Sequence, residues 1–467
     1  ARDMTAKNPE LEVFNPFDES QVGSVKINNA NEIEEMLELG FRLHKENPKG
    51  LSAHRRIQVL HRASSIMRDE FDELSMLIAA EGGKPLIDAR IEVDRAIDGV
   101  LSCASEISNI VGSEIPMGLT PAAESKIAFT TREPIGLVLA ISAFNHPLNL
   151  IVHQVAPAVA TGCPVIVKPA DDTPLSCQRF ISILAEAGLP KGWAQMACCD
   201  VGLAQEMVTD QRINFFSFIG SAKVGWHLRS LLSPGTRMAL EHGGAAPVIL
   251  DESADIDLLV PILAKGGFYH SGQVCVSVQR VFMLGNHKEE IVSKLGEYAD
   301  NLIVGNAIDE KTECGPLIRN SEVDRVESWV NEAQDGGAKI IAGGRRVSSS
   351  CYAPTVLLNP PTEAEVSKNE IFGPVISLYE SESLSEAISM CNSLPFAFQA
   401  SIFSNNYSNI IQFFNNVDAS AVMINDHTAF RVDWMPFAGR GQSGYGIGGI
   451  PFTMEDMTKI KMAVFSY

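Results

Sequence analysis

One cysteine, Cys275, stands in a sequence context that suits covalent chemistry. It lies in the stretch YHSGQVCVSV, residues 269–278, just after a Gly-Gln turn and ahead of a β-branched run. A thiol on such a turn can meet a substrate, whereas Cys103, Cys163 and Cys391 lie inside apolar runs, where a thiol is usually inert packing. Cys275 is therefore the candidate nucleophile, and a small buried core residue is the alternative.

Two further residues could assist such a nucleophile. Glu241, in MALEHGGAAP, lies between a predicted strand and a Gly-Gly pair, where a carboxylate can move and act as general base for water. A solvated strand-end carboxylate is the alternative. Asn145, in SAFNHP, follows another predicted strand, and its side-chain NH2 could hold an oxyanion. It could instead cap the helix that the following proline opens.

The elements that must position these residues alternate along the chain. Residues 30–111 carry apolar residues at helical spacing, and 113–133 suit a projecting β-hairpin. Strands are then predicted at 135–142, 164–169, 193–199, 213–220 and 237–243, with helices between them that include 147–162 and 173–188. A second α/β stretch has strands near 247–250, 280–284, 374–380, 399–404 and 421–425. Thr173 and Pro174 read as the N-cap and first residue of one helix.

Repeated βα units with short links favour parallel, doubly wound sheets, the usual frame for a nucleotide. We predict an α/β protein with two interlocked, doubly wound domains and a small β oligomerisation flap. The first domain is predicted at 1–113 and 133–242, the second at 243–451, and the oligomerisation hairpin and tail at 114–132 and 452–467. The family resemblance described below implies that the first is a Rossmann-like NAD-binding domain and the second the catalytic domain.

Composition excludes several classes of function. The 37 basic and 57 acidic residues give a net charge of −20, which repels nucleic acid and anionic lipid surfaces. No apolar run approaches the roughly 20 residues of a spanning helix, and the polar N-terminus lacks a signal-peptide core, so a cytoplasmic protein is expected. The nine cysteines lack a disulfide framework or a CxxC or Cys/His cluster, so reduced thiols and no metal site are expected.

A glycine turn supplies a candidate phosphate site. GSAKVG, residues 220–225, forms a GxxxxG turn that enters a predicted helix, so Gly220, Ser221 and Gly225 mark the site. A helix N-terminus there offers N–H groups, and Ser221 a hydroxyl, to a pyrophosphate.

Seven motifs in order resemble those of the NAD(P)-dependent aldehyde dehydrogenase superfamily. The likeness runs from FNPFDE near the N-terminus to PFTMEDM near the C-terminus. The motifs are SAFNHP, VIVKPADDTP, FIGSAKVG, LEHGG, GQVC, EIFGPV and PFAGRGQSGYG.

The resemblance implies a role for each residue of the motifs. Cys275 would attack the aldehyde, Asn145 would hold the oxyanion, and Glu241 would activate the water that hydrolyses the thioester. Lys168 and Asp171 would hold the adenosine ribose, and a carboxylate there favours NAD over NADP. Glu370 and Phe372 would contact the nicotinamide side of the cofactor. Ile141, Ser142 and Ala143, ahead of Asn145, are assigned to the cofactor site as well.

Departures from the family pattern bear on the substrate. Phe144 and His146 flank the asparagine, and Arg431 stands where relatives that use fatty or aromatic aldehydes tend to place an aromatic wall. With Arg95, His146 and Arg431 could clamp an anionic tail. In the alternative, Arg431 pairs with Asp433 or Asp426, and Arg95 with Glu92. Val274 replaces an arginine found in some users of phosphorylated aldehydes, which weakens a triose-phosphate assignment.

Several alternatives stay open from sequence alone. A small polar or anionic aldehyde is expected, oxidised to the free acid. A CoA-acylating semialdehyde dehydrogenase, a catalytically inactive NAD-binding relative and a cysteine hydrolase are the rivals. The hairpin and the alternating tail predict a homodimer or homotetramer.

Overall fold

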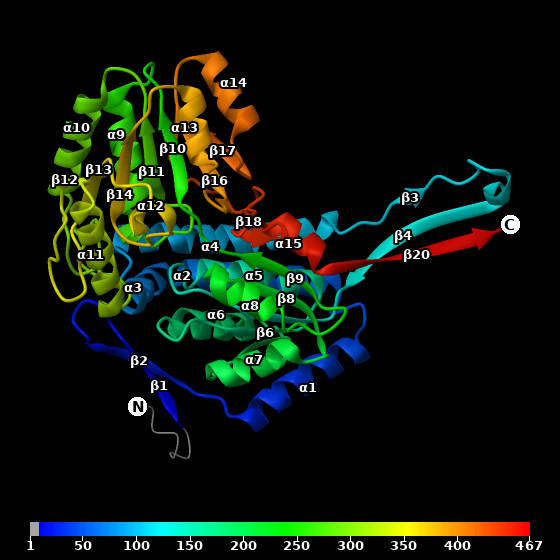
Figure 1. Ribbon diagram of the computed structural model, residues 1–467. Helices are drawn as coiled ribbons and strands as arrows, with labels where there is room; N and C mark the ends of the chain where they lie inside the picture. Colours follow the sequence, from blue (N-terminus) through cyan, green and yellow to red (C-terminus); the bar gives the residue numbers. More distant parts are fainter. Residues whose placement is uncertain (1–8) are drawn as a thin grey trace.

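The computed structural model describes residues 9–467. The first eight residues, which belong to the predicted NAD-binding domain and to the polar N-terminus, lie outside the described residues. Two large sheets, each covered by helices, form the body, and a narrow β-arm projects from it (Figure 1). Within residues 9–467, no helix combines the length and the apolar character that crossing a membrane requires.

The first sheet has the strand order β19-β9-β8-β5-β6-β7. The five strands from β5 to β9 pair in parallel, and the direction in which successive strands are added reverses between β5 and β8. Ligands bind at such a reversal in doubly wound folds. The strands are β5 (Leu137–Ile141), β6 (Val165–Lys168), β7 (Ala194–Met196), β8 (Ile213–Ile219), β9 (Arg237–Glu241) and the antiparallel β19 (Gly444–Tyr445).

Helices cover both faces of this sheet, as the doubly wound prediction requires. The connecting helices are α5 (Asn149–Thr161), α6 (Pro174–Glu186), α7 (Val201–Thr209) and α8 (Ala222–Arg229). The N-terminal helices are α1 (Ala30–Glu46), α2 (Ala53–Asp69), α3 (Phe71–Gly82) and α4 (Leu86–Glu106). Within residues 30–111, where the sequence shows apolar residues at helical spacing, Glu70 separates α2 from α3.

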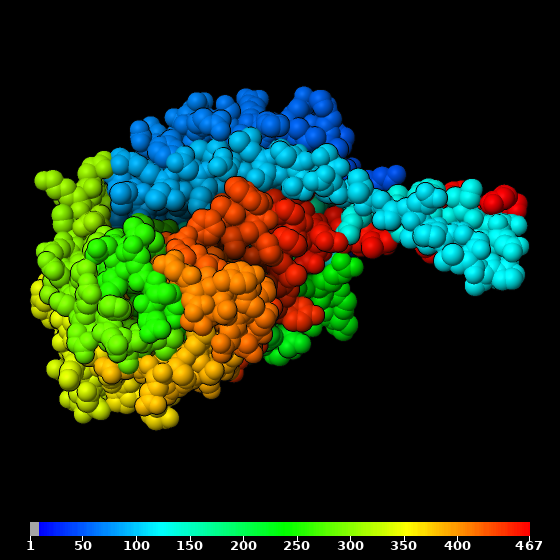
Figure 2. All heavy atoms as spheres, turned by 90° about the horizontal axis from the view of Figure 1, so that it is seen from above, coloured from blue at the N-terminus to red at the C-terminus, as the bar shows by residue number. Residues whose placement is uncertain are grey.

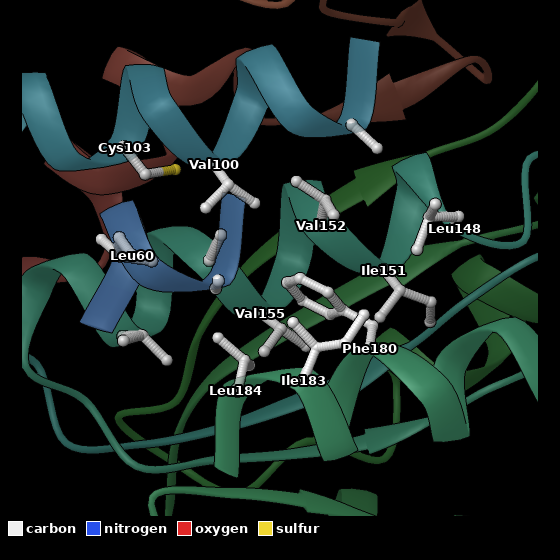
Figure 3. Packing of buried hydrophobic residues seen from close by; sticks show 14 of the residues in the cluster. Leu60, Val100, Cys103, Leu148, Ile151, Val152, Val155, Phe180, Ile183 and Leu184 are labelled. Carbon is white, nitrogen blue, oxygen red and sulfur yellow. The ribbon is translucent and has the colours of Figure 1, made fainter. Parts of the chain in front are cut away.

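The core on one face of the first sheet is formed by α2, α4, α5 and α6 (Figure 3). Leu60, Val100, Val155 and Phe180 are fully or almost fully buried there, because these helices carry apolar residues at 3.6-residue spacing. Cys103 lies in the same packed layer and is fully buried. It is therefore a packing residue, as predicted.

The N-cap assigned to Thr173 is not made by its side chain. The Thr173 hydroxyl donates to the Phe144 carbonyl at 3.5 Å and does not cap the helix. Instead the buried Glu81 carboxylate of α3 accepts the Leu175 and Ser176 backbone N–H groups at 2.8 and 2.9 Å. A carboxylate from a distant helix thus satisfies the free N–H groups of α6.

The second sheet has the order β12-β13-β14-β11-β10-β16-β17 and is parallel except for β12. Sequence analysis located five of these strands and missed the short pair β12 and β13. The strands are β10 (Ala246–Leu250), β11 (Val278–Met283), β12 (Lys339–Ala342), β13 (Thr355–Leu358), β14 (Val375–Glu380), β16 (Gln399–Phe403) and β17 (Ala421–Ile424). The helices are α9 (Ile256–Phe268), α10 (Lys288–Asn301), α11 (Asn320–Asp335), α12 (Glu365–Lys368), α13 (Leu384–Cys391) and α14 (Tyr407–Asn416).

The two halves interlock through the C-terminal part of the chain. After β17 the chain returns to the first sheet, where β19 pairs with β9, and α15 (Ile450–Asp456) packs on α4 and α5. Two small ladders complete the body: β1 (Glu10–Phe14) with β2 (Gln21–Lys26), and β15 (Phe396–Ala397) with β18 (Arg440–Gly441). The domain boundaries given above stay a prediction.

The arm is built from β3 (Glu114–Ile115), β4 (Lys126–Pro134) and the C-terminal β20 (Thr458–Ser466). Both neighbours of β4 are antiparallel to it, and β20 pairs along the whole of β4. The arm stands clear of the body in the space-filling view (Figure 2). The predicted hairpin and the alternating tail therefore lie in one sheet.

Candidate active site

The three proposed catalytic residues line one cavity of about 650 Å³. Asn145 follows β5, Glu241 ends β9, and Cys275 lies in the loop between α9 and β11. The strand-end positions place Asn145 and Glu241 at the carboxyl edge of the first sheet, and the second half of the fold brings Cys275 to that edge. The three residues that the sequence assigned to one reaction therefore lie around one cavity.

A left-handed turn presents Cys275. His270, Ser271 and Gly272 have φ values of 47°, 56° and 70°, so the chain reverses sharply after α9 ends. A Cβ on Gly272 would lie 2.0 Å from the Gly373 carbonyl oxygen, so only glycine fits. The cysteine itself is half-buried and opens onto the cavity, not onto the outer surface as the exposed turn in the sequence suggested.

The Gln273 side chain fixes this loop, a role that sequence analysis missed. Its Oε1 accepts the Ile318 N–H at 3.0 Å, and its Nε2 donates to the His270 and Pro316 carbonyls, each at 3.3 Å. The Gln273 carbonyl accepts the Asn145 Nδ2 group at 2.9 Å. Asn145 is thus not the cap of α5. It contacts the cysteine loop and retains a second N–H donor.

Burial dominates the electrostatics of the thiol. It raises the pKa of Cys275 to about 12, and the carboxyl groups of Glu370 and Glu241 act in the same direction. The positive charge of Arg431 opposes this rise. Arg431 therefore favours the thiolate, the form that attacks a carbonyl.

Arg431 also faces the proposed base. Burial raises the pKa of Glu241, while Arg431 lowers it. A carboxyl group with a raised pKa is a better proton acceptor near neutral pH than an ordinary one. The Glu241 Oε1 atom lies over Gly448, where a Cβ would come within 2.1 Å, so a glycine makes room for the carboxylate.

The cofactor residues occupy the same cavity, with two exceptions. Lys168 Nζ donates to Asp171 Oδ1 at 2.9 Å, directly after β6. Gly220 lies in the turn after β8, and its N–H donates to the Glu241 carbonyl at 3.0 Å. The predicted cofactor residues that line the cavity are Ser142, Ala143, Lys168, Asp171, Gly220, Ser221, Glu370 and Phe372. Ile141 and Gly225 are not among the lining residues.

Unsatisfied polar atoms make this cavity a fit for a nucleotide cofactor. The Glu370 Oε1 and Ser142 Oγ atoms are buried and have no hydrogen-bonding partner within residues 9–467. Burial raises the pKa of Glu370 to about 8. Its carboxyl group lies against Gly243, where a Cβ would approach Oε1 to 1.6 Å. Such groups need polar partners, which a ribose and a carboxamide can provide.

Arg325 and Trp329 of α11 line the cavity as well, and sequence analysis missed both. The Arg325 guanidinium carbon lies 4.6 Å from the Trp329 ring centroid, and its Nη2 donates to the Ile371 carbonyl at 2.7 Å. Its Nη1 is buried without a partner among the described residues. Their spacing on an amphipathic helix resembles ordinary packing, so the sequence carried no signal for them.

Of the three residues in the predicted clamp, Arg95, His146 and Arg431, only Arg431 is a cation without a carboxylate partner among the described residues. Arg95 donates from Nε and Nη2 to Asp433 at 3.1 and 2.7 Å. The pairing of Arg95 with Glu92 was wrong, because Glu92 binds the buried Lys84. His146 contacts the Tyr269 hydroxyl at 3.2 Å, and burial holds its pKa well below the ordinary value, so its ring is neutral.

Arg431 makes no ion pair with Asp433 or Asp426. Its guanidinium carbon lies 3.5 Å from the Phe437 ring centroid, and its Nε is buried without a partner within residues 9–467. Asp433 is occupied by Arg95, by His153 Nε2 at 2.7 Å and by Asn149 Nδ2 at 3.2 Å. These contacts anchor the loop that carries Arg431. Burial lowers the pKa of Arg431, and the negative charge of Glu241 opposes that change.

The chain resembles aldehyde dehydrogenases over almost its full length. A sequence model described as the aldehyde dehydrogenase family matches residues 4–463. A 3-sulfolactaldehyde dehydrogenase of Priestia aryabhattai is 33% identical over 458 residues, which cover 98% of this chain and 95% of that protein.

Solved structures give the same result. An aldehyde dehydrogenase from Physcomitrella patens, in complex with the reaction product succinate, has a TM-score of 0.96 and 32% identity, covering 99% of this chain and 96% of that one. A glyceraldehyde-3-phosphate dehydrogenase from Methanocaldococcus jannaschii, complexed with NADP, has a TM-score of 0.93 and 32% identity, covering 98% and 99%.

Proposed function

Because the chain belongs to the aldehyde dehydrogenase family and is an NAD(P)-dependent oxidoreductase, we propose that it oxidises a small aldehyde with an anionic tail to the free carboxylic acid. One observation carries this proposal. Cys275, Asn145 and Glu241 share a cavity with Arg431, a cation that has no carboxylate partner among the described residues.

The chemistry follows from these groups. The Cys275 thiolate adds to the aldehyde carbon, and the Asn145 amide and the Cys275 backbone N–H stabilise the oxyanion of the thiohemiacetal. Lys168, Glu370 and Phe372 line the part of the cavity that would hold NAD(P)⁺, and the bound cofactor would supply the hydride acceptor that oxidation of the thiohemiacetal to a thioester requires. Glu241 then takes a proton from water, the water oxygen attacks the thioester carbon, and the C–S bond breaks to release the acid and the thiolate.

Glu241 separates this proposal from its rivals. In a CoA-acylating enzyme a thiol resolves the thioester and no base for water is needed, whereas Glu241 lines the cavity that holds Cys275. A cysteine hydrolase needs a histidine beside the thiol. His146 and His242 line the cavity, but His146 contacts the Tyr269 hydroxyl at 3.2 Å and His242 the Gly220 carbonyl at 2.9 Å, and neither is hydrogen-bonded to Cys275 within residues 9–467.

The proposed cofactor is NAD or NADP. The expectation that NADP is less suitable is not supported, because one similar structure contains NADP. That expectation rested on Asp171 alone. Its neighbour Lys168 offsets the negative charge of Asp171 at 2.9 Å.

The anionic tail has support from two directions. The three similar proteins act on or contain compounds that carry a sulfonate, a carboxylate or a phosphate, as their names state. Arg431, stacked on Phe437, presents the planar guanidinium that binds such groups. Val274 lines the cavity without a charge, and Arg431 is the cation whose charge lowers the pKa of Cys275.

Replacing Arg431 by alanine is expected to lower kcat/KM for anionic aldehydes about 10- to 100-fold more than for neutral aldehydes of the same size, because a charge-assisted hydrogen bond contributes about 1.5–3 kcal/mol. The measurement is NADH or NADPH formation with aldehydes that carry neutral, carboxylate, phosphate and sulfonate tails. Arg440→Ala is the matched control, since Arg440 pairs with Asp418 at the surface. Equal losses for all aldehydes would contradict an anion-binding role for Arg431.

We also propose that the arm mediates self-association, as a dimer or tetramer. Ile460, Met462 and Val464 of β20 are 63%, 56% and 48% exposed, and they alternate along an exposed strand. Apolar residues so arranged favour pairing. Val464→Glu is therefore expected to shift the protein toward monomer in size-exclusion chromatography with light scattering, whereas Lys461→Ala is not. A wild-type monomer with full activity would refute this.

A further inference from the structure

A second ion pair lies beside the proposed ribose site. Arg319, which precedes α11, donates from Nε to Asp172 Oδ1 at 2.9 Å and from Nη2 to Asp172 Oδ2. Asp172 follows Asp171, the partner of Lys168, and all four residues line the cavity that holds Cys275. Arg319 comes from the half of the fold that carries the second sheet, so it reaches the cofactor side across the cavity.

The charges in this part of the cavity balance. Lys168 and Arg319 carry two positive charges, and Asp171 and Asp172 carry two negative charges. Asp172 and Asp171 both raise the pKa of the Arg319 guanidinium, so both carboxylates interact with it electrostatically. The repulsion of a phosphate by Asp171 is therefore offset by two cations, of which the sequence motif revealed only Lys168.

We propose that Arg319 determines how strongly this enzyme binds NADP: together with Lys168, its guanidinium donates hydrogen bonds to the 2′-phosphate. The inference rests on the proposed placement of the adenosine ribose at Lys168 and Asp171. A guanidinium binds phosphate and carboxylate with the same two-pronged geometry, so the phosphate would take the place of Asp172.

Exposure and charge define where the phosphate goes. The Arg319 side chain is 58% exposed, and an ion pair open to solvent contributes little, so exchange of Asp172 for a phosphate is not opposed by a strong bond. Arg319 and Asp172 also line a second hollow, whose other lining residues include Glu12 and Glu19. Those carboxyl groups repel a phosphate in the second hollow. The phosphate is therefore expected on the side of Arg319 that faces Lys168.

Nucleotide binding tests the proposal without any aldehyde. Calorimetry on the full-length protein would compare adenosine 2′,5′-bisphosphate with 5′-AMP. In Arg319→Ala, the affinity for the bisphosphate is expected to fall roughly tenfold or more, whereas that for 5′-AMP changes less than about twofold. Asp172→Asn is expected to raise the bisphosphate affinity, because it removes the competing carboxylate. Arg440→Ala is the control.

Two outcomes would overturn the proposal. Equal losses for both nucleotides in Arg319→Ala would show that Arg319 only holds the two halves of the fold together. Unchanged affinities for both would show that it does not contact the nucleotide. Because this is a binding measurement that needs no turnover, it tests the role of Arg319 even if the proposed aldehyde oxidation is wrong. In the active enzyme, Arg319→Ala should lower the NADP to NAD ratio of kcat/KM.

Discussion

Cys275→Ala is expected to lower kcat for aldehyde oxidation by a factor on the order of 10⁴ or more, with cofactor affinity retained. The nucleophile is the only group in the proposed sequence that forms a covalent bond with the substrate, so no other side chain can replace it. Cofactor affinity should persist, because the proposed nucleotide contacts are made by other residues. The measurement is the initial rate of NADH formation, with cofactor binding measured separately.

Cys391→Ala is the matched control for this variant. Cys391 is buried in a hydrophobic cluster of the second half of the fold, so its loss should affect stability and leave activity near the wild-type value. Substantial turnover by Cys275→Ala would contradict the assignment of the nucleophile. A comparable loss in Cys391→Ala would mean that any thiol removal disturbs the fold.

Glu241→Gln is expected to slow the steady-state rate about 10²- to 10⁴-fold while sparing the first turnover. Glutamine keeps the size of the side chain but cannot accept a proton from water, so the thioester should form and persist. Stopped-flow absorbance should then show a burst of NADH close to one per active site, followed by a slow phase. Glu252→Gln, at a surface position beside Gly285, is the control.

A Glu241→Gln variant that slows the burst as much as the steady state would place Glu241 in the first chemical step. Such a result would suit a role in removing the thiol proton, because burial raises the pKa of Cys275 to about 12. Rescue of turnover by CoA in this variant would show that the thioester is accessible to a thiol. Turnover that requires CoA in the wild type would favour the acylating rival.

Much of the fold and the central part of the site could be predicted from sequence. Strand positions followed from short apolar runs between turn residues, and Asn145 and Glu241 follow two of those strands. In a parallel sheet such residues share the carboxyl edge, so their convergence is a consequence of topology. Cys275 was found by its turn context, and the motif order linked it to the other two.

The charge state of the proposed substrate site could not be predicted. Arg95 and Asp433 are 338 residues apart, and nothing local in either segment indicates that they pair. The same loop leaves Arg431 unpaired, although Asp433 lies two positions away. His146 was counted as a cation, but burial among other positive groups keeps it neutral. Each outcome depends on the tertiary environment, which composition and spacing do not encode.

Cross-cavity contacts were missed for the same reason. Arg319 pairs with Asp172, which lies 147 positions earlier in the chain. Gln273 binds the backbone of Ile318, a residue of another segment. Glu81 caps α6 from a helix far earlier in the chain, although a local threonine seemed sufficient. Short strands such as β15, β18 and β19 have only two residues each, too few for a periodic pattern.

The most direct test of the account is the identity of the atom that carries the acyl group. Glu241→Gln, mixed with NAD and an aldehyde with a carboxylate or sulfonate tail, would be quenched in acid and digested for mass spectrometry. The account predicts that the peptide with Cys275 gains the mass of the aldehyde less two hydrogen atoms. Acid formation without any such adduct, or an adduct on a different residue, would contradict it.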